Sequence, residues 1–144
     1  MKKPFLTHLA ISMMPPFTVL ILQMARVQFF PGHGELDNVA HFFGGFSIAW
    51  MFTIIVHALR EQPHLLWGRA IIPSPTPTWL TDFTVWGTVA LVGIAWEFFE
   101  FSMDVIYGFH MQPSLADTMG DLLFDLSGGL LFLLIYRLVI RVKR

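Results

Sequence analysis

The sequence predicts an all-α integral membrane protein, a four-helix bundle in which residues 1–144 form a single transmembrane domain. Two observations predict this fold class. The composition is 55% hydrophobic and 13% charged, far from that of the average soluble protein. Four apolar stretches also approach the roughly 20 residues that cross about 30 Å of hydrocarbon. They cover about residues 5–30, 39–59, 83–107 and 122–140.

The first stretch follows two lysines and could be taken for a secretory signal. Its apolar run is longer than the roughly 7 to 15 residues of such a signal, and no small-residue cleavage site follows it. We therefore expect a retained helix. The chain has no cysteine, which excludes a disulfide framework and a thiolate metal site.

The basic residues predict the orientation of the helices. Eight of the nine Lys and Arg residues lie before the first stretch, between the second and third, or after the fourth, and Arg26 is the exception. Lys and Arg accumulate on the cytoplasmic side of a membrane, so both termini and the Pro-rich loop 60–82 are predicted to be cytoplasmic. These scattered basic residues also exclude a nucleic-acid-binding surface.

Acidic residues gather where the apolar stretches reach the opposite face. Seven of the ten Asp and Glu residues fall in three short windows: Asp37; Glu97, Glu100 and Asp104; and Asp117, Asp121 and Asp125. Within the second and third windows the spacing is three or four residues, which puts each set on one helix face. The predicted orientation brings all three windows to the outer side, although it was derived from Lys and Arg alone.

The deeper acids are predicted to point into the bundle, because a charge at the bilayer centre costs about 2.5 to 3.5 kcal/mol. They are Glu97, Glu100, Asp121 and Asp125. The nearby bases, His41 and Arg26, are too few to neutralise them. Either several carboxyls are protonated or a bound cation supplies the missing charge. Asp104 and Asp117 have a second interpretation, as water-exposed or helix-capping side chains.

His41 makes a metal site a concrete hypothesis. It follows Asp37 by one helical turn on the acidic side, and imidazole with carboxylates suits divalent Zn, Mn or Fe. The predicted metal ligands are His41, Glu97, Glu100, Asp121 and Asp125. Glu97 and Asp121 are the catalytic candidates. The candidates for a substrate or proton pathway are Asp37, Asp104, Asp117 and Arg26.

Three motifs resemble the VanZ-like superfamily of small bacterial membrane proteins, and most closely its YjdF-like inner-membrane branch. They are DNVAH, WEFFE and SLADTMGDLLFDLSGG, within about residues 37–129. The resemblance implies a multi-pass protein of the bacterial cytoplasmic (inner) membrane with an outward-facing polar site. Its patterns fall on Asp37 and His41, on Glu97 and Glu100, and on Asp117 and Asp121.

This chain departs from the family pattern in four ways. Asn38 stands where the family commonly has Lys, Glu100 where it has Gln, and Asp121 where it has Asn, and no Arg precedes Ser114 as the family often shows. Each change makes the site more acidic. The departures separate this chain from the best-known family activity, low-level resistance to a glycopeptide antibiotic.

Three functions remain open at this stage. The first is a pocket that binds a metal ion or a cell-envelope substrate, with metal-assisted chemistry on a lipid-linked molecule. The second is a proton- or cation-coupled transporter, which with four helices would need a homodimer or another partner. The third is a non-catalytic accessory or resistance protein of the envelope. Whether the protein is an enzyme, and which metal it takes, stays undecided by the sequence.

Overall fold

The structure is a computed structural model that describes residues 5–29, 34–61 and 77–142. These residues form four helices and no strand, which confirms the predicted all-α class. The helices are α1 (Phe5–Phe29), α2 (Gly34–Glu61), α4 (Thr78–Tyr107) and α5 (Leu115–Val142). Most of the predicted Pro-rich loop, residues 62–76, lies outside the described residues.

Three of these helices begin earlier than their apolar stretches do. α5 begins at Leu115, where the Ser114 hydroxyl and carbonyl both accept the backbone N–H of Asp117. Ser114 is therefore the cap, and Asp117, considered above for that role, lies inside the first turn. α4 begins after Pro77, whose carbonyl accepts the N–H groups of Leu80 and Thr81. Hydropathy locates the apolar centre of a helix, whereas hydrogen bonding extends the helix into its polar ends.

Three helical segments are long and apolar enough to cross a membrane: Phe5–Phe29, Glu35–Arg60 and Leu115–Ile140. α4 is also long, with 30 residues, but it is not among them. Its sequence carries four acids together with several Thr and Trp residues, which lower its hydropathy. A fourth crossing by α4 thus stays a prediction.

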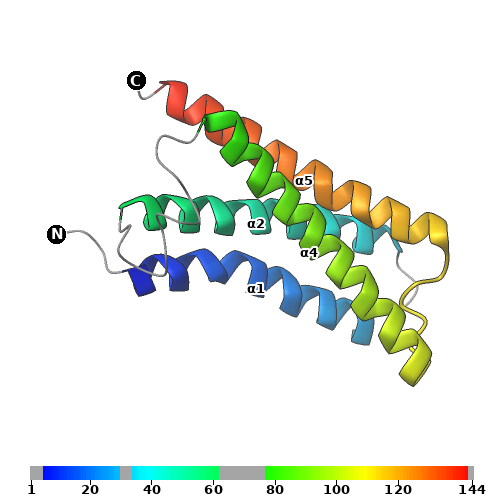
Figure 1. Cartoon of the computed structure of the whole chain (residues 1–144). Coiled ribbons are helices and arrows are strands. Elements are labelled where there is room, and N and C mark those ends of the chain that lie inside the picture. Colours follow the sequence, from blue (N-terminus) through cyan, green and yellow to red (C-terminus); the bar gives the residue numbers. More distant parts are fainter. Residues whose placement is uncertain (1–4, 30–33, 62–76, 143–144) are drawn as a thin grey trace.

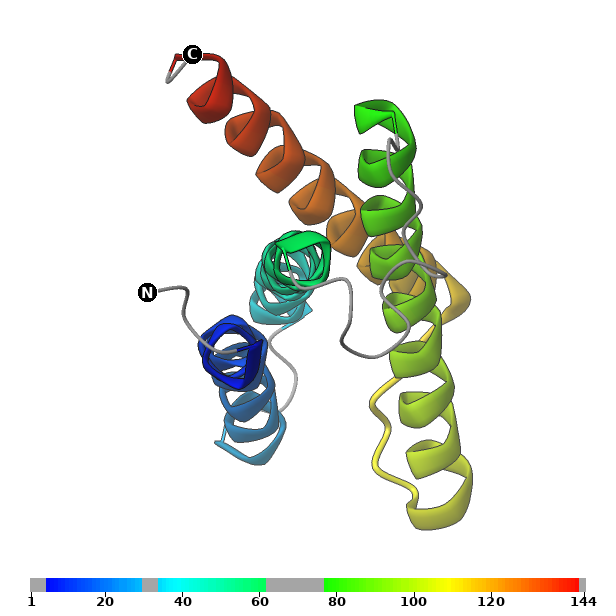
Figure 2. The same ribbon diagram turned by 60° about the vertical axis from the view of Figure 1, so that its left-hand side comes forward.

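The helices are arranged around α2 (Figure 1). α2 packs against α1, α4 and α5, and its contact with α5 is the most extensive. Among the described residues, α1 packs against α2 alone. Figure 2 shows α1 and α2 side by side, while α4 and α5 cross and splay apart at one end. The start of α1 and the end of α5 lie at the same end of the bundle (Figure 1).

Two glycines set the crossing of α2 and α5. A Cβ at Gly45 would collide with the Asp125 carbonyl, and one at Gly128 would collide with the Phe42 carbonyl. Small residues at such positions let helix backbones touch. The crossing therefore carries Asp125 directly onto α2.

The bundle is apolar toward the end that holds the start of α4. Ala49, Val85, Val89, Phe132 and Leu133 form a buried cluster there. The buried acids occupy the other end. The acids nearest to this cluster, Glu97 and Asp125, are about two helical turns from Val89 and Phe132 along their helices. The fold thus separates an apolar core from a polar one.

Candidate functional site

The α2 part of the site consists of Asp37 and His41, both buried. They are one turn apart on the helix, and His41 Nε2 lies 3.8 Å from Asp37 Oδ1. α1 supplies the partners of Asp37. Its Oδ1 atom accepts a hydrogen bond from Gln23 Nε2 at 2.5 Å and lies 2.7 Å from Arg26 Nη2. Arg26 Nε also donates to Gln23 Oε1, so the two α1 side chains hold Asp37 as a unit.

α4 contributes Glu97 and Glu100, which are three residues apart and share a face. Glu100 is fully buried, and its Oε1 atom accepts a hydrogen bond from Trp96 Nε1 at 2.9 Å. The Gln112 amide donates to both the carbonyl and the Oε2 atom of Glu97, at 3.0 and 2.6 Å. Each glutamate keeps one carboxylate oxygen without a hydrogen-bond partner.

α5 contributes Asp117, Asp121 and Asp125 at steps of four. Asp121 is 1% exposed, and neither of its carboxylate oxygens has a hydrogen-bond partner. Its Oδ1 atom lies 3.9 Å from His41 Nε2. Asp125 lies on the other side of the imidazole, with Oδ2 3.3 Å from His41 Nδ1. His41 is thus held between two aspartates of one helix.

These side chains bring ligand atoms within metal-binding range of one another. Three triads have ligand atoms that all lie within 4.8 Å: Asp37, His41 and Glu100; His41, Glu97 and Asp121; and Asp37, Asp117 and Asp121. Two atoms that each lie about 2.1 Å from one ion are at most about 4.2 Å apart. The two distances measured from His41 Nε2 meet that limit.

The site has far more acid than base. Six carboxyl groups converge on it, and the described bases near them are Arg26 and His41. An unpaired buried charge is costly. The arrangement therefore needs protons or a cation to be stable.

The positions of several predicted site residues differ from their predicted roles. Asp37 and Asp117, predicted for a pathway, belong to ligand-spaced triads. Asp125, predicted as a ligand, faces the imidazole nitrogen that points away from Asp37 and Asp121. Asp104 belongs to none of the three triads. Its carboxylate accepts the backbone N–H groups of Met111 and Gln112 at 2.6 and 2.8 Å, which fixes the connection from α4 to α5.

Sequence reasoning missed Gln23, Gln112 and Trp96. Each donates a hydrogen bond to a buried acid of the site. The amides gave no signal because neutral polar residues near helix ends are common. Trp96 stands next to Glu97 and four residues before Glu100, and that helical spacing was the available signal.

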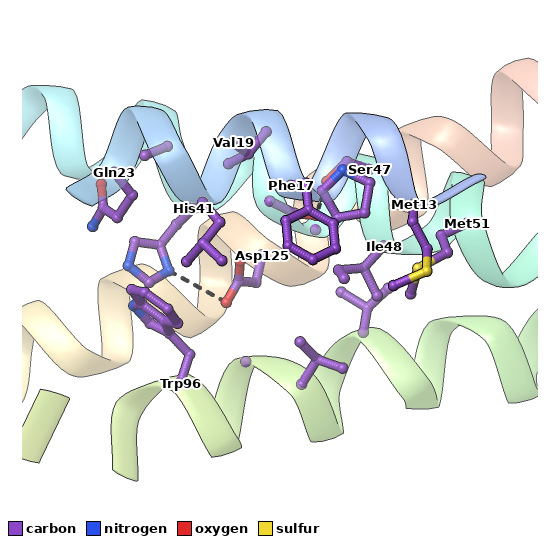
Figure 3. A pocket seen from close by; sticks show the side chains of 18 residues that line it. Met13, Phe17, Val19, Gln23, His41, Ser47, Ile48, Met51, Trp96 and Asp125 are labelled. Atoms are coloured by element: carbon purple, nitrogen blue, oxygen red, sulfur yellow. Dashed lines mark hydrogen bonds and ion pairs between the residues drawn. The ribbon is translucent and has the colours of Figure 1, made fainter. Parts of the chain in front are cut away.

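A cavity of about 340 Å³ adjoins the site (Figure 3). Side chains of α1, α2 and α4 form most of its wall, and α5 contributes Asp125. His41, Gln23 and Trp96 lie toward one end of the view, and Met13 and Met51 toward the other. The rest of the lining is apolar except for Ser47, whose hydroxyl donates to the Gly44 carbonyl. The charged side chains therefore lie at one end only.

Comparison with known proteins identifies the family. The predicted membrane protein family DUF2238 matches residues 6–141 of the chain. The chain belongs to this family. An uncharacterized protein of Thermotoga maritima is 31% identical over 93 residues, which cover 64% of this chain and 42% of that protein. The chain therefore spans less than half the length of this relative. No solved structure matches this chain. As a DUF2238 member it is a membrane protein, and its chemistry must be inferred from the site.

Proposed function

We propose that this DUF2238 protein binds a divalent metal ion inside the membrane and uses it to bind a cell-envelope substrate. The observation that supports the proposal best is the set of unpartnered atoms in the His41, Glu97 and Asp121 triad. His41 Nε2, Glu97 Oε1 and both Asp121 oxygens are buried without a hydrogen-bond partner. Buried polar atoms are nearly always satisfied, and a cation would satisfy these four together.

The surroundings of His41 support the same assignment. A ligating histidine commonly donates its other ring N–H to a carboxylate, which fixes the tautomer. Asp125 is placed for this role at Nδ1, leaving Nε2 for the ion. Imidazole with carboxylates favours Mn, Fe or Zn over Ca or Mg. A three-ligand site also leaves coordination positions open for water or a substrate, through which metal-assisted chemistry could follow.

Transport of protons or cations is the weaker alternative. A path through one chain would need polar groups between the acidic site and the opposite end. The described residues in that region include the apolar cluster of Ala49, Val89 and Phe132. The observations therefore favour a binding site over a conduction path. An accessory protein without a metal would have to neutralise these buried groups with protons alone.

We further infer an outward-facing site in the bacterial inner membrane. The inference is supported by the charge distribution and by the VanZ-like motifs, and family membership itself requires only a membrane. Arg60 and Arg137 both bind the first turns of α4, at the end away from the acids. A Pro113→Cys variant should react with an impermeant thiol reagent from outside the cell. Reaction from the cytoplasm alone would reverse the orientation.

Elemental analysis of the purified protein tests metal binding. We expect a stoichiometric transition metal in the parent and its loss in Glu97→Gln and in Asp121→Asn. Asp82→Asn is the matched control, because Asp82 pairs with Arg137 away from the triads. Retention of the metal in all three variants, or no metal even after reconstitution with Mn or Zn, would refute the proposal.

A further inference from the structure

We propose that the cavity beside His41 holds the hydrocarbon chain of a single lipid whose phosphate head group binds the metal. This inference rests on the proposed function for the head group, and on the cavity alone for the chain. It names the class of substrate that the site would receive: an amphiphile with one end apolar and the other a metal-binding oxyanion.

The shape of the cavity suits one lipid chain. On α1 its lining runs from Gln23 to Met13, and on α2 from Ala40 to Met51. Ten residues of helix correspond to about 15 Å, which is half of the roughly 30 Å hydrocarbon thickness of a bilayer. The cavity thus extends over about one leaflet. Its volume falls within the about 300 to 1,000 Å³ of ordinary ligand sites.

The polarity of the cavity matches the orientation of a lipid. Gln23, His41 and Asp125 line the end near the acids, and Phe17, Ile48 and Met51 line the part beyond (Figure 3). A lipid in the leaflet on the acidic side has its head at that surface and its chain toward the bilayer centre. The cavity presents its polar and apolar parts in the same order.

The helix packing gives a lipid a way in. α1 and α4 both line the cavity, yet among the described residues they make no direct packing contact. α2 forms the wall between them. A chain could therefore enter laterally from the bilayer between α1 and α4, without passing through the apolar core.

Charge complementarity selects the head group. Six carboxyls around one guanidinium would repel an anion, whereas a divalent ion at His41 with open coordination positions would attract one. Phosphate oxygens are hard ligands that bind such ions readily. Binding of a phosphate lipid should therefore depend on the metal, and binding of a neutral lipid chain should not.

Photo-crosslinking of the full-length protein tests the proposal. The probe is dodecyl phosphate with a diazirine in the middle of its chain, used with Mn and then with chelator. We expect mass spectrometry to find labels on cavity-lining residues, among them Phe17 and Ile48, with about a tenfold loss of labelling on chelation. The corresponding dodecanol probe should label the same residues equally with and without Mn.

Two tryptophan variants test the position of the chain. Val92→Trp should fill the cavity and lower its labelling about tenfold, because Val92 lines it. Ile94→Trp is the matched control on the same helix, since Ile94 is about as exposed as Val92 but does not line the cavity. Labels confined to outward-facing positions, or equal losses in both variants, would overturn the chain site.

The metal experiment separates the two proposals. If the protein retains its metal but the cavity is not labelled, the lipid inference fails and the proposed function stands. If dodecanol labels the cavity while the phosphate probe labels it equally with and without Mn, the chain site stands and the role of the metal in head-group binding is refuted.

Discussion

The two ends of the bundle differ in how their charged side chains are paired. At one end Asp82 meets Arg137, with Oδ1 and Oδ2 accepting from Nη2 and Nε at 2.5 and 2.8 Å. At the other end, six carboxyls share Arg26 and His41. The first arrangement is neutral and partly exposed, whereas the second is acidic and, except for the half-buried Asp117, buried. A bidentate pair is complete within the protein, whereas the acidic end needs protons or a cation to balance its charge.

Aromatic and hydroxyl groups reinforce the comparison. Near Arg137, Tyr136 hydrogen-bonds His57, and Arg60 donates to Thr81. Each of these groups has a partner within the chain. At the acidic end the atoms left without a hydrogen-bond partner belong to the groups with the strongest affinity for cations. Structural stability explains the first end, and the metal binding proposed above would account for the second.

The largest expected effect comes from removing the guanidinium of the acidic end. Arg26→Met leaves Asp37 without its base, and both side chains are largely buried. Breaking a buried ion pair costs about 3 to 5 kcal/mol, so the metal-free variant should unfold at markedly lower temperature in detergent. Saturating Mn should recover part of this loss, because the ion brings positive charge to the same acids.

Arg26→Lys controls for the charge. It should retain most of the stability while losing the hydrogen bond from Arg26 Nε to Gln23. If Arg26→Met melts like the parent in chelator, the acidic end is already neutral without its arginine, and the contrast between the two ends disappears.

The second effect is stabilisation by metal. A ligand that binds only the folded state at a hundredfold excess over its dissociation constant adds about 2.7 kcal/mol. Mn or Zn should therefore raise the melting temperature of the parent and of Asp82→Asn, but leave that of Asp121→Asn unchanged. The increase should shrink as the pH is lowered, because protons compete with the metal for carboxylate and imidazole ligands. Equal shifts in all three proteins would place the metal outside the triads.

Much of the acidic end could be predicted from the sequence, because the cost of a charge in lipid leaves few positions for an acid. The stripe of Glu97 and Glu100 and that of Asp121 and Asp125 had to face inward, and the structure places them there. The spacing of Asp37 and His41 similarly put both on one face. These inferences needed only helical geometry and the energetics of the bilayer.

The rest depends on tertiary geometry that the pattern does not carry. Which nitrogen of His41 faces Asp125 depends on how α2 crosses α5, and the Gly45 and Gly128 contacts fix that crossing. Ser114 was missed as the start of α5 because it lies beyond the apolar stretch. The cavity escaped prediction because it results from two helices, α1 and α4, that do not pack together.

A third, intermediate effect concerns the side-chain amide of Gln112, which donates to Glu97 at the acidic end. Gln112→Leu removes the donor to Glu97 Oε2 and leaves a buried acceptor unpaired, at a cost of about 1 to 3 kcal/mol. Its melting temperature in chelator should fall by less than that of Arg26→Met. Gln112→Glu is the informative companion, because it adds a seventh acid and should melt lower still until metal is added. Identical melting of both variants and the parent would mean that the amide contributes nothing to this end.

The smallest effect is expected at the neutral end, which holds Asp82 and Arg137. Removing both charges with Asp82→Asn and Arg137→Met leaves no unpaired ion, and partly exposed pairs contribute about 1 kcal/mol or less. The double variant should therefore melt close to the parent, whereas Arg137→Met alone should be less stable because Asp82 then lacks its base. Metal content should be unchanged in both. Thermal unfolding and elemental analysis of the same samples measure the stability and the metal content.

A double variant that unfolds as easily as Arg26→Met, or loses its metal, would show that the two ends are coupled through α5. The neutral end could then no longer serve as the control for the acidic one.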